Sequence, residues 1–227
     1  MANAMLFGKR TDEDDTVVAM LAAALRRDIS FGTLLPDQKL KIEALRQRYG
    51  GSSHSMRETL RMLSAEGLVE ATSQRGFRVM SATEDDLRDI LLMRLHVEKL
   101  GLERSMARAT VDWEGRVIAA LHALRRAEEQ VQANPDDLTA LEWDEACRAF
   151  SAVLVEASGS ARLIDLQEKF YNQSRRFRLA LLREGRLDFA VRADRQSALQ
   201  EAILNKSADR ALMLLEEDIR ADLTGKT

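Results

Sequence analysis

The pair Gly50-Gly51 separates two short amphipathic segments near the N-terminal end of the sequence. Glycine accepts the left-handed backbone conformation that closes a helix, so the segment Ile42 to Tyr49 is predicted to be a helix that ends here. A second helix is predicted to begin a few residues later. Either Ser52 or Ser55 can cap it, and Ser55 to Glu58 has the spacing of a capping box. This stretch is therefore restricted to a helix, a tight turn and a second helix.

The second helix is predicted to have two different faces. Its apolar residues recur at i, i+4 and i+7 and indicate a face directed at the core: Met56, Leu60 and Leu63. Its opposite ridge carries hydrogen-bond donors at i, i+4 and i+8, with a histidine beside them: Ser53, Arg57, Arg61 and His54. Donors aligned in this way suit a helix that enters the major groove of DNA. The plain alternative is a basic face that is simply solvated.

A β-hairpin is predicted to follow this helix. Leu68 to Ala71 and Phe77 to Met80 have the composition of two strands, and the segment between them contains Arg75 and Gly76. Together with the two helices, the hairpin predicts a winged helix-turn-helix from Lys39 to Met80.

The charge balance supports a nucleic-acid site in this region. Lys39 to Arg78 contains eight basic and four acidic residues, a local charge of +4 in a chain of net charge −3. A basic region on an acidic chain is the electrostatic footprint of a nucleic-acid site. We therefore expect double-stranded operator DNA as a partner, with these candidate contacts: Lys41, Ser52, Ser53, His54, Arg57, Arg61, Arg75 and Gly76.

The rest of the chain is predicted to be helical, since two prolines and eleven glycines leave few strand boundaries in 227 residues. The fold class is mostly α, with a winged helix-turn-helix followed by an antiparallel helical bundle. We expect a disordered segment over 1–11, a DNA-binding domain over 12–80 that begins with a helix ending near Ser30, and a helical domain over 81–227. The helices of the last domain are expected at 84–109, 113–132, 136–157, 161–184, 187–205 and 207–223. Expected boundary residues are Ser81 or Thr83, Asp112, Asn134-Pro135, Ser158 to Ser160, Gly185 and Ser207.

Composition limits the compartment and the class of function. The single cysteine excludes an internal disulfide, and no apolar run approaches the ~18 residues that span a membrane. We therefore expect a cytoplasmic protein with no membrane partner. An enzyme is not expected, because the sequence has no nucleophile-base pair, phosphate-binding glycine loop or carboxylate-histidine set.

The order of residues in the first domain resembles the GntR family of bacterial transcription factors. The residues that carry the resemblance are Gly32 to Pro36, Leu40, Leu45, Gly50, Ser52, Met56 to Glu58, Leu60, Leu63, Glu66 to Val69 and Arg75 to Val79. The sequence departs from the family at two positions. Arginine is usual where Ser53 stands and proline where Ser55 stands, so the family's groove contact from that arginine is missing here.

The helical segment resembles the FCD domain of the FadR subfamily. The matching residues are Arg94, Glu98, Ala107, Phe150, Glu156 to Ser158, Leu163, Ala202, Asp209 and Ala211. The resemblance implies a homodimer in which a small organic acid, bound inside the helical domain, changes the spacing of the two DNA-binding heads.

Many members of the subfamily also hold a divalent metal with one aspartate and three histidines. The corresponding positions here are Cys147, Ser151, Gln196 and Asp218. Serine and glutamine are poor neutral ligands, so we expect no metal and no other cofactor. Cys147 is interpreted as a small buried hydrophobe.

An acidic effector would need cationic partners inside the bundle. The candidates are Arg94, Ser151, Asn172 and Arg176. Arg94 also has a plain alternative, a salt bridge to Glu98 one turn along the helix. Two functions therefore remain open: a regulator, expected to be a repressor, that responds to a carboxylate, or a DNA-binding dimer with no effector.

Overall fold

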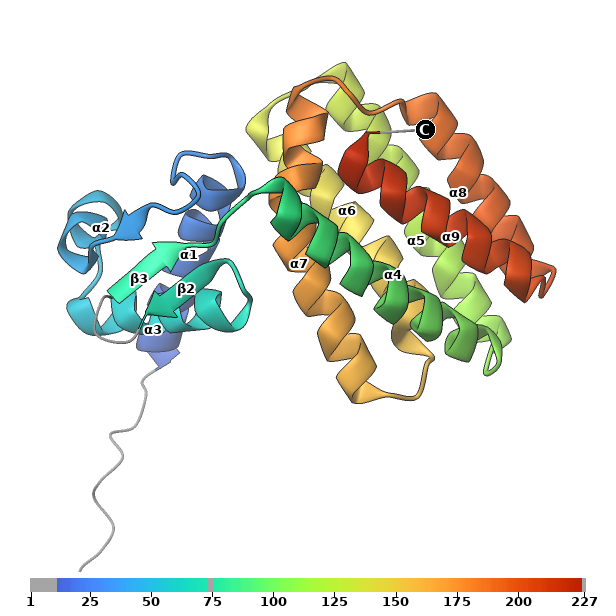
Figure 1. Cartoon of the computed structure of the whole chain (residues 1–227), viewed down its shortest axis with the longest axis horizontal. Coiled ribbons are helices and arrows are strands. Elements are labelled where there is room, and N and C mark those ends of the chain that lie inside the picture. The colour runs from blue at the N-terminus through green and yellow to red at the C-terminus, as the bar shows by residue number, and fades with distance from the viewer. Residues whose placement is uncertain (1–11, 73–75, 226–227) are drawn as a thin grey trace, which may run out of the picture. The chain divides into compact units, whose positions relative to one another are not determined.

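The computed structural model describes residues 12–72 and 76–225 (Figure 1). The expected disordered segment 1–11 lies outside these ranges. The chain divides into two compact units, Met1–Ser81 and Ala82–Thr227, next to the boundary expected after residue 80.

The first unit combines three helices with a small antiparallel sheet in the order β1-β3-β2. Its elements are α1 (Asp12–Ser30), β1 (Lys39–Leu40), α2 (Ile42–Tyr49), α3 (Ser53–Ala65), β2 (Val69–Thr72) and β3 (Gly76–Val79). The hairpin pairs Val69 with Val79 and Ala71 with Phe77. The expected winged helix-turn-helix is confirmed, with each hairpin strand displaced by one residue. The sequence prediction missed β1, which is too short to show a strand pattern.

The apolar face of α3 organises the core of the first unit. Met56, Leu60 and Leu63 are fully buried and pack in one cluster with residues of α1 such as Leu25. The turn before α3 depends on glycine. Gly50 has φ 82° and ψ −162°, which is a region open essentially to glycine alone. At Gly51 (φ +81°) a Cβ would also lie 3.0 Å from a methyl of Leu21.

The second unit consists of six helices in its described residues, as expected. They are α4 (Glu84–Met106), α5 (Val111–Ala133), α6 (Asp137–Glu156), α7 (Ala161–Arg183), α8 (Phe189–Leu204) and α9 (Ala208–Thr224). Figure 1 shows α4 lying alongside α7 and α9. No helix in the described part of the chain is long and apolar enough to cross a membrane.

The helix starts correct one detail of the prediction. Thr110 caps α5 by accepting from the backbone N–H of Trp113, so Asp112 lies inside the first turn rather than before it. Asn134-Pro135 does lie before α6, as expected, and Asp136 caps that helix. A threonine or aspartate side chain bonds the free N–H groups of the first turn.

Helices α4 and α6 approach closely at Gly101. A Cβ built there would lie 2.5 Å from Cγ1 of Val155 and 2.9 Å from Cδ2 of Leu163, far inside van der Waals contact. The glycine therefore allows α4 to pack against α6 and α7.

Candidate nucleic-acid interface and effector site

The start of α3 is fixed by a reciprocal pair of serines. Ser52 Oγ accepts from the backbone N–H of Ser55 at 3.0 Å, and Ser55 Oγ accepts from the backbone N–H of Ser52 at 2.9 Å. This is a capping box with Ser52 as the N-cap, so the alternative box from Ser55 to Glu58 is wrong. Ser55 is buried and forms part of the helix start, while Ser52 remains exposed.

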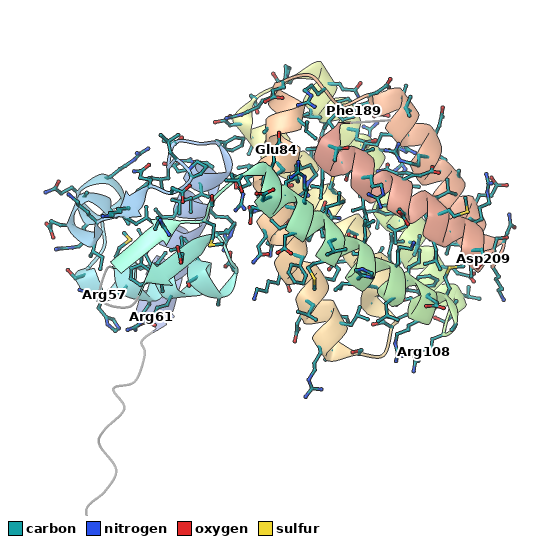
Figure 2. All side chains as sticks on the ribbon, in the orientation of Figure 1. Arg57, Arg61, Glu84, Arg108, Phe189 and Asp209 are labelled. Carbon is teal, nitrogen blue, oxygen red and sulfur yellow. The ribbon has the colours of Figure 1, made fainter. Side chains whose placement is uncertain are left out.

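The ridge expected to face DNA is exposed. Ser53, His54, Arg57 and Arg61 all lie on the solvent side of α3, opposite its buried leucines. Figure 2 labels Arg57 and Arg61 on this helix. Arg61 forms an ion pair with Glu58 on the same helix. Arg57 has no hydrogen bond or ion pair within the described residues.

The basic residues of the first unit differ in how far the protein neutralises them. Six arginines form ion pairs with carboxylates of the same unit: Arg26, Arg27, Arg46, Arg48, Arg61 and Arg78. Three cations are exposed and have no such pair among the described residues: Lys39, Lys41 and Arg57. An unpaired surface cation is free to meet a phosphate without first losing a protein partner. Of the other expected contacts, Gly76 begins β3 with φ 88°, and Arg75 lies outside the described residues.

A group of charged residues meets inside the second unit around Tyr171. We call it the Tyr171 cluster, and its members are Arg94 and Glu98 on α4, Asp144 on α6, and Tyr171, Ser174, Arg175 and Arg178 on α7. All seven are buried. The sequence prediction included Arg94 alone among them as a ligand candidate.

Two guanidinium groups face the Tyr171 ring. Cζ of Arg94 lies 4.5 Å from the ring centroid, and Cζ of Arg178 lies 4.2 Å from it. Both arginines also donate to Ser174 Oγ, at 3.3 and 3.2 Å. The two cations therefore converge on one hydroxyl and one aromatic ring.

The cluster contains more positive than negative charge. Arg94 Nε donates to Glu98 Oε1 at 2.5 Å, which is the salt bridge that the sequence allowed as the plain alternative. Asp144 accepts from Arg178 Nε at 2.9 Å and also from Arg175. Three guanidiniums thus share the two buried carboxylates, and Arg175 Nη2 also lies 4.0 Å from the exposed carboxylate of Glu145. Burial alone would lower the pKa of Arg178, but Asp144 raises it above its ordinary value, so this side chain stays charged.

Two buried donors beside these charges have no hydrogen-bond partner among the described residues. They are the hydroxyl of Tyr171, which is 2% exposed, and the indole N–H of Trp143, which is fully buried. Burial raises the pKa of Tyr171 above its ordinary value, so the hydroxyl keeps its proton and can donate. An anion that accepts hydrogen bonds would compensate such unpartnered donors.

Comparison with known proteins defines the family. Residues 18–79 match the bacterial regulatory proteins of the gntR family, and residues 89–221 match the FCD domain. The chain belongs to the GntR family. The HTH-type transcriptional repressor GlaR of Escherichia coli K12 is 31% identical over 198 residues, which cover 86% of this chain and 89% of GlaR. The HTH-type regulator BphR of Paraburkholderia xenovorans LB400 is 32% identical over 200 residues, or 88% of this chain and 81% of BphR.

Solved structures agree on the fold of this GntR-family chain. A protein from Rhodococcus sp. RHA1, described as a transcriptional regulator GntR, matches with a TM-score of 0.69 at 22% identity over 93% of this chain and 99% of its own. McbR/YncC of E. coli matches with a TM-score of 0.68 at 18% identity over 90% and 93%. Family membership makes the chain a DNA-binding transcriptional regulator with an FCD domain, not an enzyme.

The expected ligand residues of the FCD domain fall into two places. Arg94 and Ser151 belong to one network, because Glu98 accepts from Arg94 and also from Ser151 Oγ at 2.7 Å. Arg176 instead pairs with Asp86 at the start of α4, and Asn172 is half-buried with no hydrogen bond to the described residues. Sequence spacing did not separate these faces of α7, because it did not reveal which arginine turns inward.

Proposed function

We propose that this GntR-family regulator is a repressor that binds a two-fold operator as a homodimer and responds to a small carboxylate inside its helical unit. The observation that carries the DNA-binding part is the exposed ridge of α3 opposite a fully buried apolar face. The 31% identity to the repressor GlaR supports repression rather than activation.

Arg57 is the sharpest test of this ridge, because its side chain has no hydrogen-bond or ion-pair partner to lose among the described residues. We expect Arg57→Ala to lower the salt slope of operator binding by about one if the side chain meets a phosphate. If it reads a base edge, affinity falls by about 1–3 kcal/mol and one operator position is relaxed. Arg126→Ala on α5, an equally exposed arginine, is the control. Unchanged affinity and salt slope in Arg57→Ala would refute this docking of α3.

The dimer is proposed to form through α4 and α9. A groove of about 400 Å³ lies between them, and exposed leucines of α4 flank it, Leu92 at 52% and Leu100 at 49% exposure. Lysine, arginine and glutamate side chains all line the same groove, so the surface can be complementary to itself under a two-fold axis. Leu100→Glu is expected to give a monomer by light scattering, with weaker operator binding. Leu138→Glu, at a leucine of α6 that is 66% exposed, is expected to leave the dimer intact.

The Tyr171 cluster is the proposed carboxylate site. Its three buried guanidiniums suit a carboxylate, as does the Tyr171 hydroxyl, which has no hydrogen-bond partner among the described residues. Arg94 and Ser151 are retained from the sequence prediction. Asn172 and Arg176 are the less favoured candidates, since neither side chain forms a hydrogen bond or ion pair with the cluster among the described residues. A fitting ligand at 100 times its Kd stabilises a protein by about 2.7 kcal/mol, which a thermal-shift screen of small carboxylates detects.

Tyr171→Phe separates ligand binding from folding. The substitution removes a hydroxyl that has no hydrogen-bond partner in the described part of the chain, so folding stability should stay level or rise, while the shift caused by the best carboxylate should shrink. The matching neutral amide of that carboxylate should give no shift in either protein.

The alternative function is a DNA-binding dimer without an effector. It is favoured by one observation, because Glu98 and Asp144 already occupy the guanidiniums of the cluster. A wild-type protein that binds its operator tightly and shows no thermal shift with any carboxylate would support this alternative.

A further inference from the structure

The four positions at which the family places metal ligands do not form a metal site in this chain. Ser151 Oγ donates to Glu98, and Asp218 accepts from Arg195 Nε at 3.0 Å. Within residues 12–72 and 76–225, no three histidine, cysteine, aspartate or glutamate side chains are grouped to hold a metal ion. The side chains present therefore do not fit the family's metal.

The other two positions, Cys147 and Gln196, face the same side chain, Arg192 of α8. Arg192 Nη2 lies 3.3 Å from Cys147 Sγ. With its amide turned so that the oxygen faces the guanidinium, Gln196 accepts from Arg192 Nε at 3.1 Å and from Nη2 at 3.0 Å. A guanidinium has N–H donors and no acceptor, so its partners must accept hydrogen bonds. Both Cys147 Sγ and the Gln196 amide oxygen can do so.

Two buried carboxylates complete the surroundings of Arg192. Its Nε donates to Glu128 Oε1 at 2.8 Å, and its Nη1 forms an ion pair with Asp222. Glu128 is 3% exposed and Asp222 is 4% exposed, so water solvates neither carboxylate. Burial raises the pKa of Glu128, and Arg192 opposes this shift. Glu128 also pairs with Arg125, at 3.3 Å, whereas Asp222 has its ion pair with Arg192 alone among the described residues. The guanidinium therefore compensates the buried charge of Asp222 and shares that of Glu128.

We propose that the guanidinium of Arg192 holds the place of the metal ion in this chain. Like a metal ion, it joins side chains of several helices through one cation: Glu128 of α5, Cys147 of α6, Gln196 of its own α8 and Asp222 of α9. It differs from a metal ion in being covalently part of the protein. Folding and operator binding should then need no divalent cation, whether or not the Tyr171 cluster binds an effector.

Replacing Arg192 tests the idea, because a lost internal cation should be replaceable by an added one. Wild type, Arg192→Ala and Arg192→Lys are dialysed against EDTA, and melting temperatures are then measured with and without ZnCl₂ or MnCl₂. Metal content after a second dialysis is measured by elemental analysis. Arg192→Ala should melt roughly 6–20 °C lower than wild type, because it removes the ion-pair partner of buried Asp222 and one of the two partners of Glu128. Zinc or manganese should restore part of this loss at about one ion per chain.

Two controls make the result specific. Arg192→Lys keeps a cation and should respond to metal no more than wild type does. Asp222→Asn in the Arg192→Ala background removes a carboxylate and should weaken the rescue by metal.

If Arg192→Ala does not fold without metal, refolding with and without ZnCl₂ gives the same comparison, and recovery with zinc supports the proposal. A stoichiometric metal that stays with wild type through EDTA dialysis would overturn it. Equal metal responses of Arg192→Ala and wild type would overturn it as well.

Discussion

Gly101 offers a stability prediction whose size can be worked from the structure. In Gly101→Ala the new Cβ would lie 2.5 Å from Val155 Cγ1 and 2.8 Å from Val155 Cβ. Carbon atoms pack best at about 3.5–4.0 Å, so the shortfall is about 1 Å. A rotamer change can move Cγ1 but not Cβ, whose position is set by the backbone of α6. Helices α4 and α6 must therefore move apart.

Overpacking of this kind costs about 1–3 kcal/mol, and the close Cβ–Cβ contact places Gly101→Ala near the upper end. Alanine is better than glycine in a helix by about 1 kcal/mol, which offsets part of the cost. The expected net loss is about 2 kcal/mol. For a domain of this size it corresponds to a melting temperature lower by about 4–8 °C.

Both tryptophans, Trp113 and Trp143, lie in the second unit, so urea unfolding followed by tryptophan fluorescence reports on that unit. Gly115→Ala is the matched control. Gly115 is an exposed helical glycine of α5 with nothing within 4 Å of a built Cβ, and its replacement should stabilise by about 1 kcal/mol. If Gly101→Ala were stabilised as much as Gly115→Ala, the close approach of α4 and α6 would be wrong.

Three further outcomes are expected. Burial raises the pKa of Tyr49 to about 12 and that of Tyr171 also above 10, so absorbance at 295 nm should show little phenolate at pH 10.5 in the native protein and much more in urea. Because the folded-state pKa of Tyr49 is raised, its contribution to stability is complete below pH ~10 and is lost as the pH rises towards 12. Burial likewise raises the pKa of Cys147 to about 12, so a thiol reagent at pH 8 should label it only after unfolding, and rapid native labelling would contradict its burial. Ser52→Ala should lower the stability of the first unit by about 1 kcal/mol in thermal unfolding, whereas Ser207→Ala, which removes no capping bond, should have little effect on the second unit.

The sequence predicted the elements of the fold because each one has a local signal. Apolar spacing located α3, and the helices of the second unit begin and end within three residues of their expected bounds. Two errors have a local cause. β1 is only two residues long, and the reciprocal use of Ser52 and Ser55 depends on side-chain directions that spacing does not reveal.

The interior sites were harder to predict because their partners are far apart in the sequence. Arg178 meets Asp144 across 34 positions, and Arg192 meets Glu128 across 64. A charge between apolar neighbours, as at Arg178 between Phe177 and Leu179, signals burial without naming a partner. The family resemblance located Cys147 and Gln196, but it gave no indication that an arginine would face them.

The pairing of Asp144 with Arg178 restricts how α6 and α7 can move. A helix rises 1.5 Å per residue and about 5.4 Å per turn, and a hydrogen bond tolerates only a few tenths of an ångström. A partial slide of α7 along α6 would thus separate a fully buried carboxylate from its guanidinium, at a cost of several kcal/mol. Helices α6 and α7 are therefore not expected to slide gradually past each other. A signal passing through it is expected to travel as an all-or-none exchange of partners, in which one carboxylate leaves a guanidinium only as another takes its place.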